Sequence, residues 1–441
     1  MKPPPHLSAW FRRLPPRLQS AAALFSGQGA RAGYLAAVDQ GLISVANIAA
    51  TLILARSAGL AELGVYSVGF TSLRLVRSLQ EGLTIQPVNA FGAAMADAEF
   101  KPYATSTTLI QVALSICAAV LVAFLGWGLT LLGNDTLGPG VFALWPAVLF
   151  WQLQEYMRRL LYTRSRVFGA ALNTALANGV RLYLMLWWSA RGALDGAAGL
   201  SAIALGSLVA LLMGVWQTRS YWSRAFSSLL PTFQRNWSFG RYIMGGTIAN
   251  WLSVECYPLL AAGIISFEAA GAYRALQNLV APIHMLLRAL DTYLTPRAAR
   301  AYHENGLPAL RRLLRLAYLV AGAPILGLLA LAVLLPGPIL NLLYHDTFPA
   351  YQQGIYWMAL FYLLWFAYWP LQMIFKAARL SRPIFIANLT AILVMFTLGI
   401  WMVFRWDLYG TIAGQALNAA IVTIVLWSAW SKYGIRNTKY D

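Results

Sequence analysis

The chain has few charged residues and few of the residues that usually build catalytic or metal sites. Only 11% of its 441 residues are charged, and it has four histidines and two cysteines. Cys117 and Cys256 both fall within apolar segments, so no disulfide framework is implied. A hydrophobic fraction of 59% is more than a soluble core can absorb, whereas a bilayer takes about 20 apolar residues per spanning helix. The composition therefore predicts an integral membrane protein and excludes a disulfide-stapled or metal-rich soluble domain.

The apolar residues gather in twelve segments separated by short connections. We therefore expect an all-α integral membrane protein with twelve transmembrane helices. The expected helices span residues 36–56, 63–95, 106–132, 139–161, 168–190, 196–217, 239–264, 268–296, 313–335, 351–375, 383–404 and 408–430.

A basic connection between the sixth and seventh segments divides the chain into two halves of six helices. The expected parts are a cytoplasmic tail (1–35), an N-lobe (36–217), a linker (218–238), a C-lobe (239–431) and a second cytoplasmic tail (432–441). The basic, Pro-rich first tail lacks the apolar region of a cleavable signal peptide, and we expect an interfacial helix around residues 10–25.

Acidic residues are scarce, which leaves a net charge of +18. With both termini placed in the cytoplasm, 25 of the 33 Lys and Arg residues fall on the cytoplasmic side, three on the opposite side and five within segments. This asymmetry follows the positive-inside rule and predicts the orientation. The positive charge then faces anionic lipid, and no nucleic-acid partner is expected.

A weak internal repeat relates the two halves. The sequence LGVYSVG from Leu63 resembles AGAYRAL from Ala270, with Gly64 and Tyr66 matching Gly271 and Tyr273 at an offset of 207 residues. Because six spans is an even number, the two repeats have parallel topology. Repeats of this kind with a substrate site between them are typical of transporters.

Charged residues inside the second apolar segment need a physical explanation. Arg74, Arg77 and Glu81 are spaced i, i+3, i+7 and form one stripe on a helix, with Arg74 near mid-bilayer. A central Arg costs about 2.5–3.5 kcal/mol on insertion scales, so the stripe should face protein or a water-filled cavity. A purely structural alternative is that Arg77 and Glu81 neutralise each other as an i,i+4 pair.

The eighth segment repeats this pattern. Its polar residues are Arg274, Gln277, His284, Arg288 and Asp291, close to one helical face. His284 could equally be a hydrogen-bonded packing residue.

Polar residues also occur on the first, fifth and seventh segments, at Asp39, Asn47, Arg181, Asn250 and Glu255. The simplest geometry is a hydrated, net-basic cavity between two bundles. Glu155 with Arg158 and Arg159 is interpreted as an ion pair anchored at the membrane interface. The aromatic run from Tyr356 to Trp369 is interpreted as lipid-facing packing in preference to a sugar platform.

Arginine suits one class of ligand in such a cavity. Its planar guanidinium matches phosphate oxygens bidentately and stays charged at physiological pH. The arginines therefore favour an anionic group that travels with a lipid tail, and they would repel an isolated amphiphilic cation.

Two stretches resemble a known family. VDQGLISVANIAATLILARSAGLAELGVYSVGF (38–70) and QEYMRRLLYTRSRVFGAALN (154–173) look like the bacterial polysaccharide transporters, the Wzx-type O-antigen and exopolysaccharide flippases. These belong to the multidrug/oligosaccharidyl-lipid/polysaccharide (MOP) exporter superfamily. The resemblance implies a V-shaped, MATE-like fold of two pseudo-symmetric six-helix bundles. It also implies an inner-membrane flippase that moves a polyprenyl-pyrophosphate-linked oligosaccharide by alternating access.

We assign roles to the intramembrane residues on this basis. No cofactor or metal is expected, and the expected partners are the lipid-linked substrate, membrane lipids, and a polysaccharide polymerase with its co-polymerase. The pyrophosphate candidates are Arg74, Arg77, Arg274, Arg288 and Arg181; the sugar candidates are Asn47, Asn250 and Gln277; and the candidates for ion coupling are Asp39, Glu81, Glu255 and His284.

Two other functions remain open from the sequence. A multidrug or cation antiporter of the same fold would need an acidic cavity, for which Asp39 and Glu255 give some support. A membrane glycosyltransferase or polymerase would need a sizeable catalytic loop, and the longest expected periplasmic connection, 336–351, offers only His345 and Asp346. We therefore expect a transporter and not an enzyme.

Overall fold

The computed structural model describes residues 28–133, 137–223, 229–344, 351–378 and 380–437. All regular secondary structure in these residues is helical. The expected interfacial helix at residues 10–25 lies outside the described residues. The main α-helices are α3 (Gln28–Gln80), α4 (Asp97–Leu131), α5 (Leu137–Phe142), α6 (Trp145–Thr163), α7 (Val167–Ser189), α8 (Gly196–Thr218), α9 (Leu229–Asn250), α10 (Tyr257–Leu260), α11 (Phe267–Leu279), α12 (Ala281–Leu334), α13 (Pro336–Tyr344), α14 (Gly354–Ala377), α15 (Ser381–Val394) and α16 (Ile400–Asn437).

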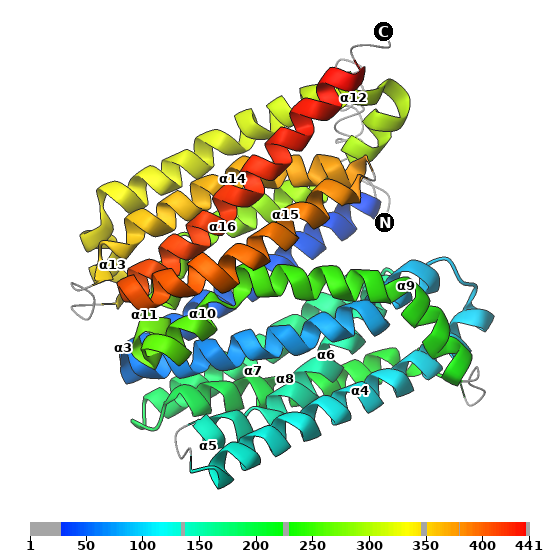
Figure 1. The fold of residues 1–441 in the computed structure, drawn as a ribbon. Helices are drawn as coiled ribbons and strands as arrows, with labels where there is room; N and C mark the ends of the chain where they lie inside the picture. The colour runs from blue at the N-terminus through cyan, green and yellow to red at the C-terminus, as the bar shows by residue number, and fades with distance from the viewer. Residues whose placement is uncertain (1–27, 134–136, 224–228, 345–350, 379, 438–441) are drawn as a thin grey trace, which may run out of the picture.

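The helices form two bundles that meet at one end and spread apart toward the other (Figure 1). One bundle contains α4 to α8 with the second half of α3, and the other contains α11 to α16. The expected all-α fold with two lobes is therefore confirmed.

Three very long helices each contain a backbone break that separates two expected segments. Gly59 interrupts α3 with φ of 86°, and Gly306 interrupts α12 with φ of 62°. Both glycines adopt a left-handed conformation that costs other residues free energy. The third break is in α16 at Asp407, whose φ is 48°. The boundaries between segments one and two, eight and nine, and eleven and twelve thus fall where the chain turns.

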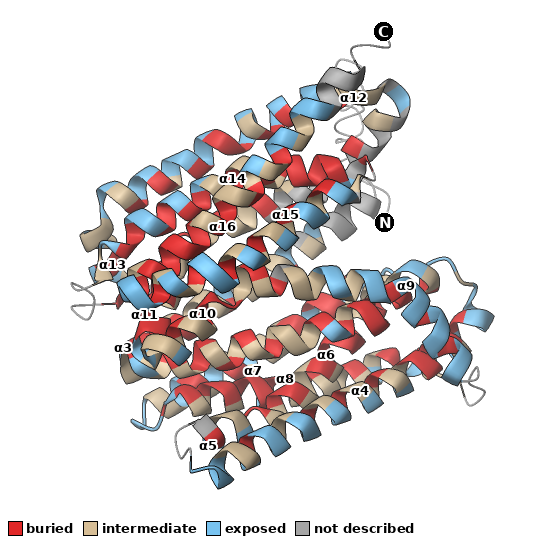
Figure 2. Ribbon diagram, in the orientation of Figure 1, coloured by how far each residue is buried: buried red, intermediate tan, exposed pale blue. Residues whose placement is uncertain are grey.

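The outside of the bundles is apolar. Exposed side chains include Leu121, Phe124, Leu212, Leu319 and Phe404, each more than half exposed. Figure 2 shows exposed residues on the outer faces of the helices and buried residues where helices pack together. Apolar side chains on both faces of a helix are typical of a membrane span.

Six helical stretches in the described residues are long and apolar enough to cross a membrane, and a bent pair in the seventh segment makes up to seven. Two of these stretches, 34–92 and 382–432, have 59 and 51 residues, which is enough for two crossings each at about 20 residues per span. The chain is a multi-pass membrane protein. The count of twelve spans stays a prediction.

The seventh segment differs from the expected division of the chain. Helix α9 begins at Leu229, inside the expected linker, and the span bends by 50° between its parts 229–255 and 257–265. Gly240 of α9 packs against the backbone of Gly82, and Tyr103 donates a 2.9 Å hydrogen bond to Asn236. The first half of this span therefore packs on the N-lobe, although the sequence places the span in the C-lobe.

Candidate functional site

The two lobes are joined at the end where α3 breaks. Arg56 donates hydrogen bonds to the carbonyl oxygens of Leu343 at 2.8 Å and Leu342 at 2.6 Å, at the end of α13. Asn278 donates a 2.6 Å hydrogen bond to the Thr51 hydroxyl. The positive-inside orientation predicts that this end is the extracytoplasmic one.

A cavity of about 600 Å³ lies between the joined end and the open ends of the bundles. This volume is within the range of ordinary ligand pockets. Side chains from α3, α6, α7, α9, α11 and α12 line it, so both lobes contribute. Its charged lining consists of Arg74, Arg77, Arg158, Arg159, Arg181, Arg274, Glu81, Glu155 and Glu255.

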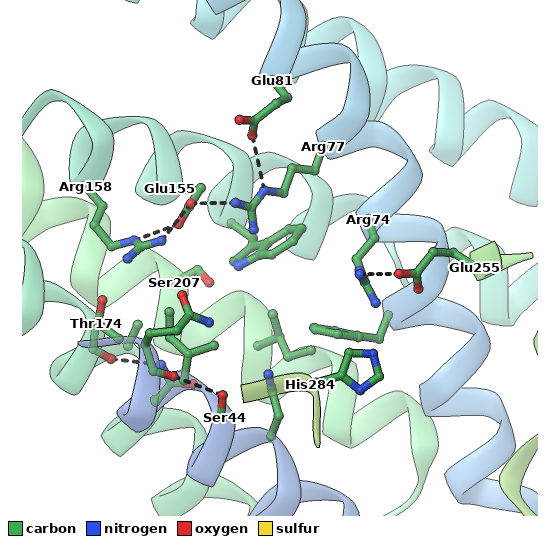
Figure 3. A pocket seen from close by; sticks show the side chains of 18 of the residues that line it. Ser44, Arg74, Arg77, Glu81, Glu155, Arg158, Thr174, Ser207, Glu255 and His284 are labelled. Atoms are coloured by element: carbon green, nitrogen blue, oxygen red, sulfur yellow. Dashed lines mark hydrogen bonds and ion pairs between the residues drawn. The ribbon is translucent and has the colours of Figure 1, made fainter. Parts of the chain in front are cut away.

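Glu155 is the centre of a buried ionic network on the N-lobe side of the cavity (Figure 3). It accepts hydrogen bonds from the Nε and Nη2 atoms of Arg158, both at 2.8 Å, and from Arg159 at 3.0 Å. Arg77 reaches the same carboxylate at 3.0 Å and lies 3.9 Å from Glu81. A carboxylate with three guanidinium partners stays ionised and fixes their positions.

Asp39 belongs to the same network and lies behind the cavity wall. It is 2% exposed and accepts hydrogen bonds from Arg158 at 2.6 Å and from the Tyr162 hydroxyl at 2.5 Å. The network thus connects α3 to α6 and holds three arginines against three acids.

A second ion pair spans the cavity. Arg74 on α3 donates to Glu255 at 2.6 Å, and Glu255 lies in the π-helical turn Trp251–Glu255 of the seventh segment. Figure 3 shows this pair apart from the Glu155 network, with His284 below it. Glu81 also lies in a π-helical turn, Glu81–Ile85. Such turns often occur at functional sites because they rearrange helix geometry locally.

Arg181 and Arg274 also line the cavity, and among the described residues neither has a carboxylate within ion-pair distance. Arg181 on α7 donates to Asn47 at 3.0 Å, and Arg274 on α11 donates to Gln277 at 2.7 Å. His284 hydrogen-bonds to the Tyr362 hydroxyl at 2.9 Å and packs against Trp365.

The structure brings most residues predicted from the sequence to one cavity. Arg288 and Asn250 lie on α12 and α9, but their side chains are outside the described part of the chain. Asp39 is buried behind the wall. The predicted residues that line the cavity are Arg74, Arg77, Arg181, Arg274, Asn47, Gln277, Glu81, Glu255 and His284.

Sequence reasoning missed the role of the charges on α6. Glu155, Arg158 and Arg159 were interpreted as an interface pair, whereas Glu155 is 4% exposed and all three line the cavity. The signal was available: Glu155 is spaced i, i+3 and i, i+4 from two arginines at the depth where a partner on another helix could meet it.

The fold is that of the MOP superfamily transporters. An inward-facing multidrug resistance MATE family transporter superposes with a TM-score of 0.65 at 13% identity, covering 90% of this chain and 95% of that one. An inward closed conformation of the lipid II flippase MurJ superposes with a TM-score of 0.67 at 14% identity, covering 89% and 87%. An outward-facing MATE family structure superposes less closely, at 0.57. At these identities the likeness establishes the fold.

The sequence itself points to one family within this fold. Residues 92–301 match the family model described as polysaccharide biosynthesis protein. The comparison with curated proteins gave no match. This match agrees with the resemblance drawn from the sequence, and the solved structures establish the fold.

Proposed function

We propose that the protein is a flippase of the bacterial inner membrane that moves a polyprenyl-pyrophosphate-linked oligosaccharide for polysaccharide biosynthesis, with both termini in the cytoplasm. The observation that carries the proposal is the charge of the cavity, where six arginines meet three glutamates in the described lining. A net-basic chamber between two lobes suits an anionic headgroup. The match of residues 92–301 to polysaccharide biosynthesis proteins supports the glycan.

The mechanism follows from the shape. The lobes are joined at the end predicted to be extracytoplasmic, so the cavity admits the headgroup from the cytoplasmic side while the polyprenyl tail stays in lipid. Rocking of the lobes breaks the contacts of Arg56 and Asn278 and exposes the headgroup on the other side. The chain moves its substrate without a chemical step, and a polymerase with its co-polymerase receives the product.

Binding energy has to differ between the two states if the substrate is to drive this motion. Arg74 on α3 forms a 2.6 Å salt bridge with Glu255, next to the bend of the seventh span, in the present state. An anion that competes for Arg74 weakens this bridge. Glu81, Glu255 and His284 are the cavity groups that could couple the return of the empty protein to an ion.

A cation antiporter of the same fold is the main rival. It requires carboxylates available to an organic cation. In this cavity Glu155 and Glu255 form ion pairs with arginines at 3.0 Å or less, and Glu81 lies 3.9 Å from Arg77 while also accepting a hydrogen bond from Gln86. These contacts favour the anionic substrate.

Reconstitution tests the proposal directly. The purified chain is placed in liposomes containing a fluorescent short-chain prenyl-pyrophosphate oligosaccharide, and headgroup exposure is followed by a membrane-impermeant quencher. We expect faster transbilayer movement than in protein-free liposomes, with the mass of the glycan lipid unchanged. The matched control is Arg241→Gln, an exposed arginine outside the cavity lining. Efflux of an organic cation without movement of the glycan lipid would reject the flippase, and a changed mass would indicate an enzyme.

A further inference from the structure

The neutral polar side chains of the cavity differ between its two walls. One wall, formed by the first half of α3 with α7 and α8, carries a set of amides and hydroxyls that we call the N-lobe strip. Figure 3 shows three of its members, Ser44, Thr174 and Ser207, on one side of the cavity and away from Glu255. The strip consists of Gln40, Ser44, Asn47, Thr174, Asn178 and Ser207.

Helical spacing aligns the members of the strip. Gln40, Ser44 and Asn47 are spaced i, i+4, i+7 on α3, and Thr174 and Asn178 are one turn apart on α7. The seven residues from Gln40 to Asn47 correspond to about 10.5 Å along the helix axis. The strip is therefore long enough to contact more than one sugar ring.

Arg181 connects the α3 and α7 parts of the strip. Its Nη1 atom donates to Oδ1 of Asn47 at 3.0 Å and to Oδ1 of Asn178 at 3.4 Å. The Nδ2 atom of Asn47 has no acceptor among the described residues, and Nδ2 of Asn178 uses one of its two hydrogens on the Thr174 carbonyl oxygen at 2.9 Å. The guanidinium thus fixes both amides through their oxygens, and their nitrogens keep hydrogens for a ligand.

Other members of the strip keep hydrogen-bonding capacity as well. The Gln40 amide and the Ser207 hydroxyl form no hydrogen bond within the described part of the chain. The Ser44 hydroxyl donates to the Gln40 carbonyl oxygen at 3.0 Å, which leaves its own oxygen free to accept. The Thr174 hydroxyl is buried without a described partner. Unpaired polar groups in a cavity gain free energy when a ligand supplies the missing partners.

The opposite wall, on α9 and α11, has its neutral polar groups engaged. The Thr247 hydroxyl donates to a carbonyl oxygen of its own helix at 2.8 Å. Gln277 accepts a 2.7 Å hydrogen bond from Arg274, and Asn278 donates to the Thr51 hydroxyl at 2.6 Å. Gln277, a sugar candidate from the sequence, is therefore already paired with an arginine.

We propose that the N-lobe strip is the sugar-recognition subsite of the cavity, so that selectivity for the glycan resides in the N-lobe. This assignment rests on the proposed function for the identity of the substrate. Sugar hydroxyls donate and accept at once, and so do amides and hydroxyls, whereas guanidinium groups only donate. A site built to hydrogen-bond substrate hydroxyls discriminates strongly against analogues that lack them, because its own polar groups then stay unpaired.

Transport of two lipids in liposomes tests the subsite. One short-chain prenyl pyrophosphate carries a neutral tetrasaccharide, and the other carries a single hexose. We expect Gln40→Met and Ser207→Ala to slow the tetrasaccharide lipid about three- to tenfold, because each removes a hydrogen bond to a neutral group. The single-hexose lipid should slow much less. Thr247→Val is the matched control, because it removes a cavity hydroxyl that is already paired, and both rates should stay within about twofold of the wild type.

Other outcomes reject the subsite. Equal slowing of the two lipids by Gln40→Met and Ser207→Ala indicates a general effect on the protein and overturns the assignment. Unchanged movement of the tetrasaccharide lipid overturns it too, as does slowing by Thr247→Val equal to that by Ser207→Ala. Ser207→Ala removes a single oxygen atom, so it decides the test if Gln40→Met does not fold.

Failure of the proposed function is distinguishable from failure of the subsite. If the wild type moves neither lipid, the function is rejected, and the free tetrasaccharide is added to the detergent-solubilised chain for saturation-transfer NMR. Transfer to glycan protons that falls severalfold in Ser207→Ala, and not in Thr247→Val, keeps the subsite. Absence of transfer in the wild type rejects the subsite as well.

Discussion

Gly64 lies so close to the carbonyl oxygen of Phe267 that a Cβ atom has no room between them. Gly271 makes the same contact in reverse with the carbonyl oxygen of Leu60. The sequence repeat explains this reciprocity, because an offset of 207 residues relates Leu60 to Phe267 and Gly64 to Gly271. The two halves therefore meet in a pseudo-symmetric crossing of α3 and α11 that only small residues allow.

Alanine at Gly64 or Gly271 should force the lobes apart at this end. Overpacking typically costs about 1–3 kcal/mol, and backbone atoms cannot yield as a flexible side chain would. We expect each variant to populate the state that is open on the extracytoplasmic side, measured by spin-label distances between the lobes. Gly179→Ala is the matched control, because nothing lies within 4 Å of a Cβ added there. Unchanged distance distributions in both crossing variants would contradict the prediction.

Removing the carboxylate of Glu155 should destabilise the N-lobe strongly. Glu155→Gln leaves Arg77, Arg158 and Arg159 without their shared negative charge, and breaking a buried pair costs about 3–5 kcal/mol. We expect a clear fall in the thermal unfolding temperature of the purified protein in detergent. Glu81→Gln should lower the unfolding temperature far less. The Glu81 carboxylate is as far as 3.9 Å from Arg77, so the pair is weak, and its side chain is partly exposed. Equal effects of the two variants would show that Glu155 is not the centre of the network.

Local pattern predicted the helices and the polar faces well. The gap between the segments 36–56 and 63–95 marks the break at Gly59, and the spacing of Arg74, Arg77 and Glu81 placed all three side chains on the cavity. Both features depend on residues within a few helical turns of one another, and the periodicity of polar and apolar residues predicts structure over that distance.

Pairing between distant segments could not be predicted in the same way. Arg74 pairs with Glu255, 181 residues away, and not with its neighbour Glu81. The docking of α9 on the N-lobe likewise depends on the contact between Gly82 and Gly240. Nothing in the sequence around either glycine indicates that it contacts the other. The geometry of the two lobes decides these contacts, and a single sequence does not give that geometry.

Arg56 should act as a latch at the extracytoplasmic end. It is exposed, and its two hydrogen bonds to the carbonyl oxygens of Leu342 and Leu343 join α3 to the end of α13. A cation at a helix C-terminus is worth about 0.3–1 kcal/mol at an exposed site. We expect Arg56→Ala to open this end by a smaller shift than Gly64→Ala, measured by the same spin-label distances. Arg56→Lys should retain part of the effect, and a larger shift than in Gly64→Ala would contradict this ranking.

A crosslink between α9 and the N-lobe should leave transport intact. The Cβ atoms at Gly82 and Gly240 would each meet the backbone of the other residue, and Tyr103 and Asn236 hold the same two elements together. If the first half of the seventh span moves with the N-lobe throughout the cycle, a crosslink at this contact does not slow transport. The pair Gly82→Cys and Gly240→Cys, or neighbouring positions if these are too crowded, is oxidised in a background where Cys117 and Cys256 are replaced. We expect movement of the glycan lipid at a rate close to that of the reduced protein.

The contrast with the other end of the molecule makes this result informative. A cysteine pair that joins α3 to α13 near Arg56 and Leu342 bridges two elements that must separate when the extracytoplasmic end opens. We expect oxidation of this pair to stop movement of the glycan lipid and reduction to restore it. If the α9 crosslink also stops movement, the seventh span separates from the N-lobe during the cycle and belongs to the C-lobe, as the sequence division at residues 218–238 implies. The bend of 50° in the seventh span would then be a hinge that changes during transport and not a fixed feature.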